Sequence, residues 1–182
     1  MAKAGYEQYE ISNFAQPGYA CDHNIGYWTR ENYLGLGLGA ASLLENVRYT
    51  NITDIFEYIE GSHQIAFVSE TEKFAMEKEK REMLLTDSCH IMPNFKTNLH
   101  MTADVLTRKA QMEEFMFLGL RMNCGVTRAK FEECFGIPIE GVYGIVLDKL
   151  KKQELLQMHA GKISLTEKGQ DVSNYVLAQF LL

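Results

Sequence analysis

The chain has 182 residues, 46% of them hydrophobic, and a formal net charge of -6. This length accommodates one ordinary domain, or a small domain with a fragment of another, and the composition is globular. The negative charge argues against indiscriminate binding to nucleic acid or to an anionic membrane. No apolar run approaches the roughly 20 residues that span a bilayer, and the amino terminus has no signal-peptide core. With four scattered cysteines, these features indicate a cytoplasmic protein without a disulfide framework.

The amino-terminal segment combines aromatic residues with glycines. Residues 7–15 mix aromatic and β-branched residues with polar ones, which is typical of a strand near the end of a sheet. Gln16-Pro17-Gly18 predicts a turn. Residues 33–44 predict a short buried strand, then a glycine turn, then small residues that allow close approach of two backbones.

The middle of the chain is less regular. Residues 46–51 predict the edge of a hairpin, and Thr53 is expected to cap a helix over residues 54–60. Residues 69–86 are rich in charge and favour an exposed helix or connector, with a functional charged patch as the alternative. Residues 88–102 lack periodicity and predict a loop, so a domain boundary is expected near here.

The carboxyl-terminal part has clear helix signals. A strongly apolar helix is expected to begin around Lys109. Thr127 predicts the cap of a short helix that ends at Gly136, and Pro138 predicts the start of the next helix. In that next helix the apolar residues at helical spacing are Val142, Ile145, Val146 and Leu150.

A hairpin and a last helix complete this part. Residues 155–165 predict two strands joined by a glycine turn, and Thr166 with Gly169 predicts the start of a final helix. Cys124 and Cys134 flank the apolar helices and are interpreted as core residues. A helix, a helix-turn-helix and a hairpin in this order are the layout of a winged helix.

A polar-aromatic cluster near the amino terminus carries candidate chemistry. His23 and Tyr27 stand four residues apart, which places them on one face if the segment is helical. An imidazole can ligate iron or haem and can carry protons near neutral pH. Asn24 and the indole N–H of Trp28 are candidates for orienting a polar ligand. The alternative is a histidine with one structural hydrogen bond beside a small aromatic cluster.

Two further patterns have weaker signals. Gly35, Gly37 and Gly39 allow backbone N–H groups to approach a nucleotide-like ligand, but they lack the full dinucleotide fingerprint, and close strand packing is the alternative. The pair Cys21 and His23 and a second pair at residues 89–90 supply zinc ligand types, although their separation and spacing do not match a structural zinc motif.

The winged-helix layout raises the alternative of DNA binding. From residue 109 to the end of the sequence, nine basic residues are matched by nine acidic residues. A DNA-binding domain needs a basic surface that releases counterions from phosphates. The balanced charge therefore argues against nucleic acid as a partner.

The quoted motifs resemble a known family. The segments 5–15, His23-Asn24-Ile25-Gly26-Tyr27-Trp28 and 33–37 are similar to the oxygen-independent coproporphyrinogen III oxidase-like family of radical S-adenosylmethionine (SAM) proteins. Residues 112–122, 131–136 and 165–182 are similar to the carboxyl-terminal domain of that family. The His-Asn-x-x-Tyr-Trp motif resembles the haem chaperone branch.

The resemblance implies an α+β fold with partial radical SAM barrel strands and a helical, winged-helix-like carboxyl-terminal domain. It divides the chain into a barrel end at 1–50, a helical connection and loop at 51–108 with a candidate insertion, and the carboxyl-terminal domain at 109–182. It implies haem binding by His23, as a ligand of the haem iron, with Asn24, Tyr27 and Trp28 completing the motif. It places Gly35, Gly37 and Gly39 on the SAM and substrate side, and it names a tetrapyrrole as the ligand.

Three departures from the family pattern change what this polypeptide is expected to do. The cluster signature C-x-x-x-C-x-x-C is absent from the sequence, so the [4Fe–4S] cluster that reduces SAM has no ligands here. Gly39-Ala40-Ala41-Ser42 stands where the family is expected to have Gly-Ala-His-Ser. Residues 74–108 do not match the short connection of the family.

We therefore expect the carboxyl-terminal portion of a larger protein, inactive without an amino-terminal radical SAM half. The leading hypothesis is a haem chaperone that binds and delivers haem. One alternative is a fragment of a true coproporphyrinogen III oxidase, which decarboxylates propionate side chains oxidatively, and another is a winged-helix module for DNA or protein. Because orphaned strands with open edges tend to associate, a homodimer through residues 5–45 is a further hypothesis.

Overall fold

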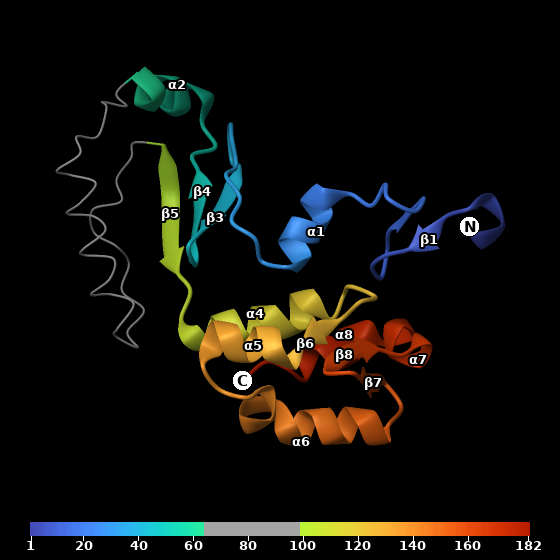
Figure 1. The fold of residues 1–182 in the computed structure, drawn as a ribbon. Coiled ribbons are helices and arrows are strands. Elements are labelled where there is room, and N and C mark those ends of the chain that lie inside the picture. The colour runs from blue at the N-terminus through green and yellow to red at the C-terminus, as the bar shows by residue number, and fades with distance from the viewer. Residues whose placement is uncertain (64–98) are drawn as a thin grey trace. The chain divides into compact units, whose positions relative to one another are not determined.

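The computed structural model describes residues 1–63 and 99–182 as an α+β chain (Figure 1). Most of the predicted connector at 69–86, the loop at 88–102 and the candidate insertion lie outside these residues. The chain forms two compact units. Unit one consists of residues 1–31 and 112–182, and unit two consists of residues 32–111. Neither unit follows the predicted division at residues 50 and 108, and that division stays a prediction.

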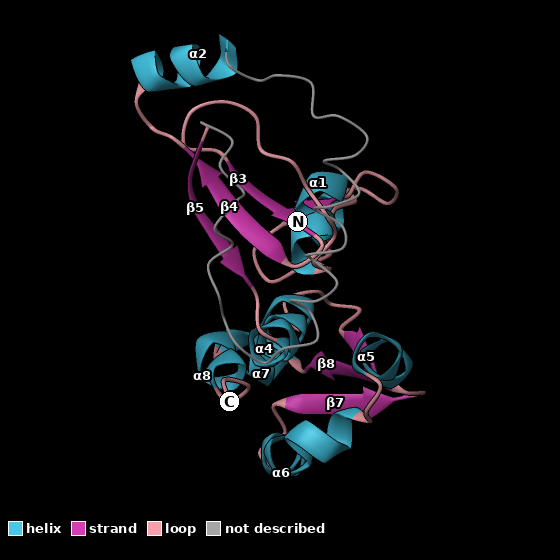
Figure 2. Ribbon diagram, turned by 90° about the vertical axis from the view of Figure 1, so that its left-hand side faces the viewer, coloured by secondary structure: helices cyan, strands magenta, loops and turns pink. Residues whose placement is uncertain are grey.

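The carboxyl-terminal part of unit one combines helices with a small sheet. Strands β6, β8 and β7 form an antiparallel sheet in that order, of which β7 and β8 are labelled in Figure 2. The helices and strands, in chain order, are α4 (Arg108–Gly119), β6 (Val126–Thr127), α5 (Arg128–Phe135), α6 (Ile139–Lys152), β7 (Leu156–His159), β8 (Lys162–Leu165), α7 (Glu167–Asp171) and α8 (Ser173–Ala178).

Local sequence signals explain most of these boundaries. The Thr127 hydroxyl accepts a hydrogen bond from the Lys130 N–H and caps α5, which ends at Gly136 in a left-handed conformation. Pro138 precedes α6. The turn between β7 and β8 has positive φ at Ala160 and Gly161, as a tight hairpin requires. These predictions are confirmed.

The core of this part is built from aromatic and aliphatic side chains. Phe131 is fully buried, and its ring lies 4.7 Å from that of Phe135, 5.4 Å from that of Phe115 and 6.1 Å from that of Tyr143. The Tyr143 ring continues the cluster to Phe180. Such edge-to-face and tilted contacts are the preferred geometries of aromatic pairs. They join α4, α5, α6 and the segment after α8 in one core.

Three expectations for this part are wrong. Ile145 is 88% exposed, because the buried face of α6 is centred on Ile139, Tyr143, Leu147 and Leu150. The other predicted positions agree with the structure, since Leu150 is buried and Val142 and Val146 pack partly buried against the core. Cys124 and Cys134 are exposed and do not belong to the core. The last predicted helix is two short helices, α7 and α8, that meet at Val172.

The amino-terminal part of unit one pairs with the carboxyl-terminal part. A 3-10 turn (Ala2–Ala4) precedes the short antiparallel strands β1 (Glu7–Gln8) and β2 (Phe14–Ala15), and α1 (Asp22–Trp28) follows. Glu10 forms an isolated bridge with Met122, and the Ile11 N–H donates to the Arg121 carbonyl at 3.1 Å. The single predicted strand at 7–15 is therefore two strands and a bridge.

Unit two contains a three-stranded antiparallel sheet, whose strands lie side by side in Figure 2. Its strands and helix are β3 (Ala41–Leu44), β4 (Val47–Asn51), α2 (Ile55–His63) and β5 (His100–Val105), and the strand order is β3-β4-β5. The predicted hairpin is confirmed, but β4 is the central strand rather than an edge. The predicted loop is wrong where β5 begins.

The start of α2 also differs from the prediction. The carboxylate of Asp54, not the hydroxyl of Thr53, accepts hydrogen bonds from the N–H groups of Phe56 and Glu57. Asp and Thr are both good capping residues, so the sequence alone placed the cap one residue early. Within the described parts of the chain, no helix has the length and apolarity to cross a membrane.

Candidate functional site

Helix α1 carries all four residues of the His-Asn-x-x-Tyr-Trp motif. His23 and Tyr27 are exposed, and their rings meet edge to face with 4.7 Å between centroids and 78° between planes. This contact follows from their spacing of four residues on a helix. The two side chains therefore form one exposed pair on α1.

The imidazole of His23 is available for coordination. Within residues 1–63 and 99–182, neither of its ring nitrogens makes a hydrogen bond, and its one ring contact is with Tyr27. A neutral imidazole nitrogen with an unused lone pair is a ligand for haem iron. The residues present thus fit an iron–porphyrin that approaches the exposed face of α1.

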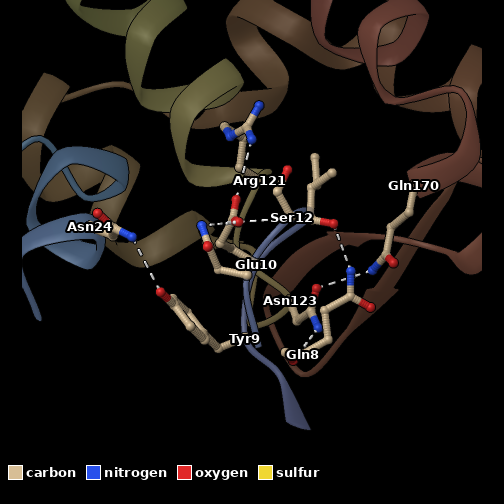
Figure 3. A network of polar contacts seen from close by, with 10 residues as sticks. Gln8, Tyr9, Glu10, Ser12, Asn24, Arg121, Asn123 and Gln170 are labelled. Carbon is tan, nitrogen blue, oxygen red and sulfur yellow. Dashed lines mark hydrogen bonds and ion pairs between the residues drawn. The ribbon is translucent and has the colours of Figure 1, made fainter. Parts of the chain in front are cut away.

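Asn24 and Trp28 contact the rest of unit one. The Asn24 amide donates to the Tyr9 hydroxyl at 3.4 Å (Figure 3). The Trp28 ring lies against the Arg121 guanidinium, with 4.3 Å between the ring centroid and the guanidinium carbon. The indole N–H of Trp28 is buried and has no hydrogen-bond partner among the described residues. In this geometry the two side chains anchor α1, whereas the sequence had suggested polar groups oriented towards a ligand.

Arg121 belongs to a buried polar network that the sequence analysis missed. Glu10 is 0% exposed, and one of its carboxylate oxygens accepts from the Ser12 N–H and from the Asn13 amide, each at 2.7 Å. Its other oxygen accepts from Arg121 at 3.3 Å (Figure 3). The only sequence signal was a glutamate inside an otherwise strand-like aromatic segment.

The same network ties the strand pair to the segment after α4. Asn123 donates from its amide to the Gln8 carbonyl at 2.6 Å and from its backbone N–H to the Tyr9 carbonyl at 3.1 Å (Figure 3). Gln170 donates in turn to the Asn123 side-chain oxygen at 3.1 Å. Residues that are more than a hundred positions apart therefore form one continuous set of polar contacts.

A second ion pair holds the carboxyl end of α1. The Arg30 guanidinium contacts the Glu114 carboxylate of α4 at 3.0 Å, and the side chains are only 10% and 8% exposed. Removing one partner of such a buried pair leaves an uncompensated charge, which is strongly destabilising. The position of α1 in unit one is thus defined by charged contacts on both Trp28 and Arg30.

In the glycine segment of unit two, residues 33–39, close packing of the backbone explains why glycine is needed at position 35. A β-carbon at Gly35 would lie 2.2 Å from the Ala41 carbonyl oxygen, so only glycine allows the two backbones to pass. The buried side chains of Ser42 and Asn51 hold the segment. Ser42 accepts from the Gly35 N–H at 2.9 Å, and Asn51 donates to the Gly37 carbonyl at 2.8 Å. This geometry agrees with the close-packing alternative, and the role of the segment near SAM stays a prediction.

No multidentate metal site is found in the described residues, where no three His, Cys, Asp or Glu side chains gather. Cys21, Cys124 and Cys134 are exposed and come from separate segments. Residues 89–90, the other half of the candidate zinc site, lie outside the described ranges. The three cysteines in the described ranges therefore do not form the ligand set of an iron–sulfur cluster.

Comparison with known proteins relates the chain to haem metabolism. Residues 106–172 match the HemN C-terminal domain. The whole chain is 36% identical over 182 residues to a haem chaperone HemW of Lactococcus lactis, and 32% identical over 181 residues to one of Bacillus subtilis. It covers 39% and 40% of these relatives, so the chain spans about two fifths of their length.

A solved structure shows the same fold. The coproporphyrinogen III oxidase HemN from Escherichia coli, described as a radical SAM enzyme, matches 99% of this chain and 38% of its own, with a TM-score of 0.63 and 14% identity. The chain belongs to the HemN-like family. Within this family it lies on the branch of the haem chaperones HemW and corresponds to their carboxyl-terminal portion.

Proposed function

We propose that this chain is the haem-binding part of a haem chaperone and that His23 ligates the haem iron. The observation that carries the proposal is the exposed imidazole of His23, with both ring nitrogens unused by the described residues, on the motif helix of a HemW-like chain. When haem is bound, an imidazole nitrogen of His23 would donate its lone pair to the iron. Tyr27 adds an aromatic edge against which a flat porphyrin packs.

A haem titration tests this proposal. Iron protoporphyrin IX is added to the purified chain and to His23→Ala, and the Soret band is followed. We expect the variant to lose specific binding, because the porphyrin retains only apolar contacts. His159→Ala is the matched control, since His159 is also exposed but lies on β7. Equal affinity of His23→Ala and the unchanged chain would contradict the proposal.

We propose that delivery of haem, rather than decarboxylation of a porphyrinogen, is the function that this chain serves. Two relatives that match the whole chain are named haem chaperones, whereas its likeness to the oxidase HemN is one of fold. Radical SAM chemistry needs three cluster thiolates that this sequence does not supply. We expect no SAM cleavage by the chain alone under reducing conditions, and cleavage would contradict this assignment.

The partner that supplies the cluster and SAM is proposed to be a radical SAM half of the family fold. Unit two exposes the apolar side chains Leu34, Leu36 and Leu38, and proteins usually cover a run of this kind with another surface. A second copy of the chain is the alternative occupant. Analytical ultracentrifugation separates the two, since only self-association through residues 5–45 gives a concentration-dependent dimer of the isolated chain.

We propose that residues 109–182 are winged-helix-like and that they contact protein rather than DNA. The succession α5, α6, β7 and β8 supports the architecture, and the charge balance of nine bases to nine acids opposes DNA binding. An electrophoretic mobility shift at low salt is the test. We expect no retarded duplex, and retardation that disappears with salt would favour a DNA-binding module.

A further inference from the structure

Helix α1 is too short to hold its own position. It has seven residues, no side-chain cap at its start and no fully buried residue. Isolated helices shorter than about 12 residues are marginal in water. Contacts from outside the helix must therefore determine where its exposed face, with His23, is held.

The main ring contact on α1 comes from Arg121, which follows α4. Its guanidinium lies 4.3 Å from the centroid of the Trp28 ring, well within the range of a cation–π contact. Trp28 follows His23 by five residues on the same short helix, which is more than one helical turn. A change in the position of the Trp28 ring therefore moves or rotates the helix that carries the His23 imidazole.

Arg121 is itself held by a buried acid. The Glu10 carboxylate contacts Arg121 through one oxygen and accepts two hydrogen bonds through the other, from Ser12 and Asn13. A carboxylate with these partners has one defined orientation, so the guanidinium that it binds has one as well. The Arg121 backbone is also fixed, because its carbonyl accepts from the Ile11 N–H.

We propose that Arg121, oriented by Glu10, is a positioning residue for the haem ligand His23. It acts through the Trp28 ring and touches neither haem nor His23. This inference rests on the proposed haem-binding function and adds a determinant of affinity from the carboxyl-terminal domain. The Arg30–Glu114 pair keeps α1 attached when Arg121 is replaced, so loss of positioning differs from loss of folding.

The test uses the full chain with the double substitution Glu10→Gln and Arg121→Met. The pair removes both charges together and leaves no buried charge without a partner, and glutamine keeps an oxygen for Ser12 and Asn13. We expect the dissociation constant for iron protoporphyrin IX to rise about tenfold, the size usual for residues that orient a metal ligand. The Soret band of the added haem should shift towards the band observed when haem is added to His23→Ala.

The matched control is the double substitution Arg128→Met and Glu140→Gln, which removes an exposed ion pair of the same domain. We expect it to leave both the dissociation constant and the Soret band unchanged. Trp28 is the only tryptophan in the chain, so its emission reports the ring contact directly. The emission should change in the Glu10 and Arg121 variant and not in the control.

Two outcomes separate this inference from the proposed function. If His23→Ala keeps its haem affinity, the proposed function fails, and the inference fails with it. If His23→Ala loses affinity but the Glu10 and Arg121 variant binds haem normally with an altered Trp28 emission, only the positioning role is overturned. Should the double variant not fold, Arg121→Lys retains the charge opposite Glu10 but lacks the flat guanidinium. We then expect a smaller rise in the dissociation constant, and an unchanged value overturns the inference.

Discussion

The two compact units differ in how much of their apolar surface they cover themselves. Unit one buries a continuous aromatic core around Phe131 and Tyr143 and satisfies the buried Glu10 with three donors. Unit two buries a few side chains of one sheet, including Leu43 and Tyr49, and exposes many others. Its exposed apolar residues include Leu34, Leu36, Leu38, Ile55, Phe56 and Ile59. Within the described residues, the difference indicates that unit one is stabilised by a larger core of its own than unit two.

The largest expected effect is in the aromatic core of unit one. Phe131→Ala removes a fully buried ring with three aromatic neighbours, and we expect it to lower the free energy of unfolding by about 3–5 kcal/mol. Urea denaturation followed by circular dichroism measures the loss. Leu36→Ala in unit two is the control, since its side chain is 81% exposed and surface substitutions usually stay within about 0.5 kcal/mol. Equal losses would remove the contrast between the units.

The stability of unit two should nevertheless be sensitive to substitution at Gly35, where two backbone segments pass close together. Gly35→Ala places a methyl group against the Ala41 carbonyl, and we expect a loss of about 1–3 kcal/mol, the usual cost of overpacking. Gly141→Ala is the matched control, because its β-carbon meets only Pro138 at 3.8 Å on an exposed part of α6. There alanine should stabilise the helix by up to about 1 kcal/mol. Thermal denaturation of both variants checks that the signs are opposite.

A smaller effect is expected from the buried hydroxyl of Tyr143. Its oxygen has no hydrogen-bond partner in the described residues, and burial, followed by the nearby Glu113 charge, raises the pKa of this phenol. Tyr143→Phe keeps the ring contacts with Phe131 and Phe180 and removes the unpaired group. We expect the variant to be as stable as the original chain or more stable by about 1 kcal/mol. A clear loss in urea denaturation would reveal a partner for the hydroxyl.

The smallest effect is a pH dependence confined to unit two. Burial lowers the pKa of His100, whose ring packs 4.3 Å from that of Tyr49, below its ordinary value of 6.5. The unfolded chain then binds the proton more readily, so the stabilising contribution is present above pH 6.5 and is lost as the pH falls below it. Amide hydrogen exchange of β4 at about pH 7.5 and about pH 5.5 measures this change.

His100→Phe provides the control for this pH effect, because it keeps an aromatic ring opposite Tyr49 and removes the titrating group. We expect exchange protection of β4 in this variant to vary less between the two pH values than in the original chain. The same dependence in both would assign the effect to another group.

The sequence predicted features that a few neighbouring residues determine. These features are the Thr127 cap, the Gly136 stop, the turn at residues 160–161 and the shared helix face of His23 and Tyr27. Each depends on contacts within one helical turn or one hairpin. The resemblance to the HemN-like family was likewise confirmed, because it was carried by contiguous motifs.

The sequence could not predict features that depend on distant partners. β5 pairs with β4 across about 50 residues. Its own sequence, His-Met-Thr-Ala-Asp-Val, does alternate polar and apolar residues, but it begins inside the expected loop and does not indicate its partner strand. The Glu10–Arg121 and Arg30–Glu114 pairs join residues 111 and 84 positions apart, and each residue alone looks like an ordinary surface charge. The anchoring role of Trp28 follows from these pairs and was hidden for the same reason.

The ion pair between Glu10 and Arg121 has a consequence for biosynthesis. Glu10 leaves the ribosome 111 residues before Arg121, a delay on the order of ten seconds at common elongation rates. Throughout that interval the acid is hydrated and α1 lacks the ring contact that seats it. Nascent chains should therefore position α1 in unit one only after the segment that follows α4 has been translated.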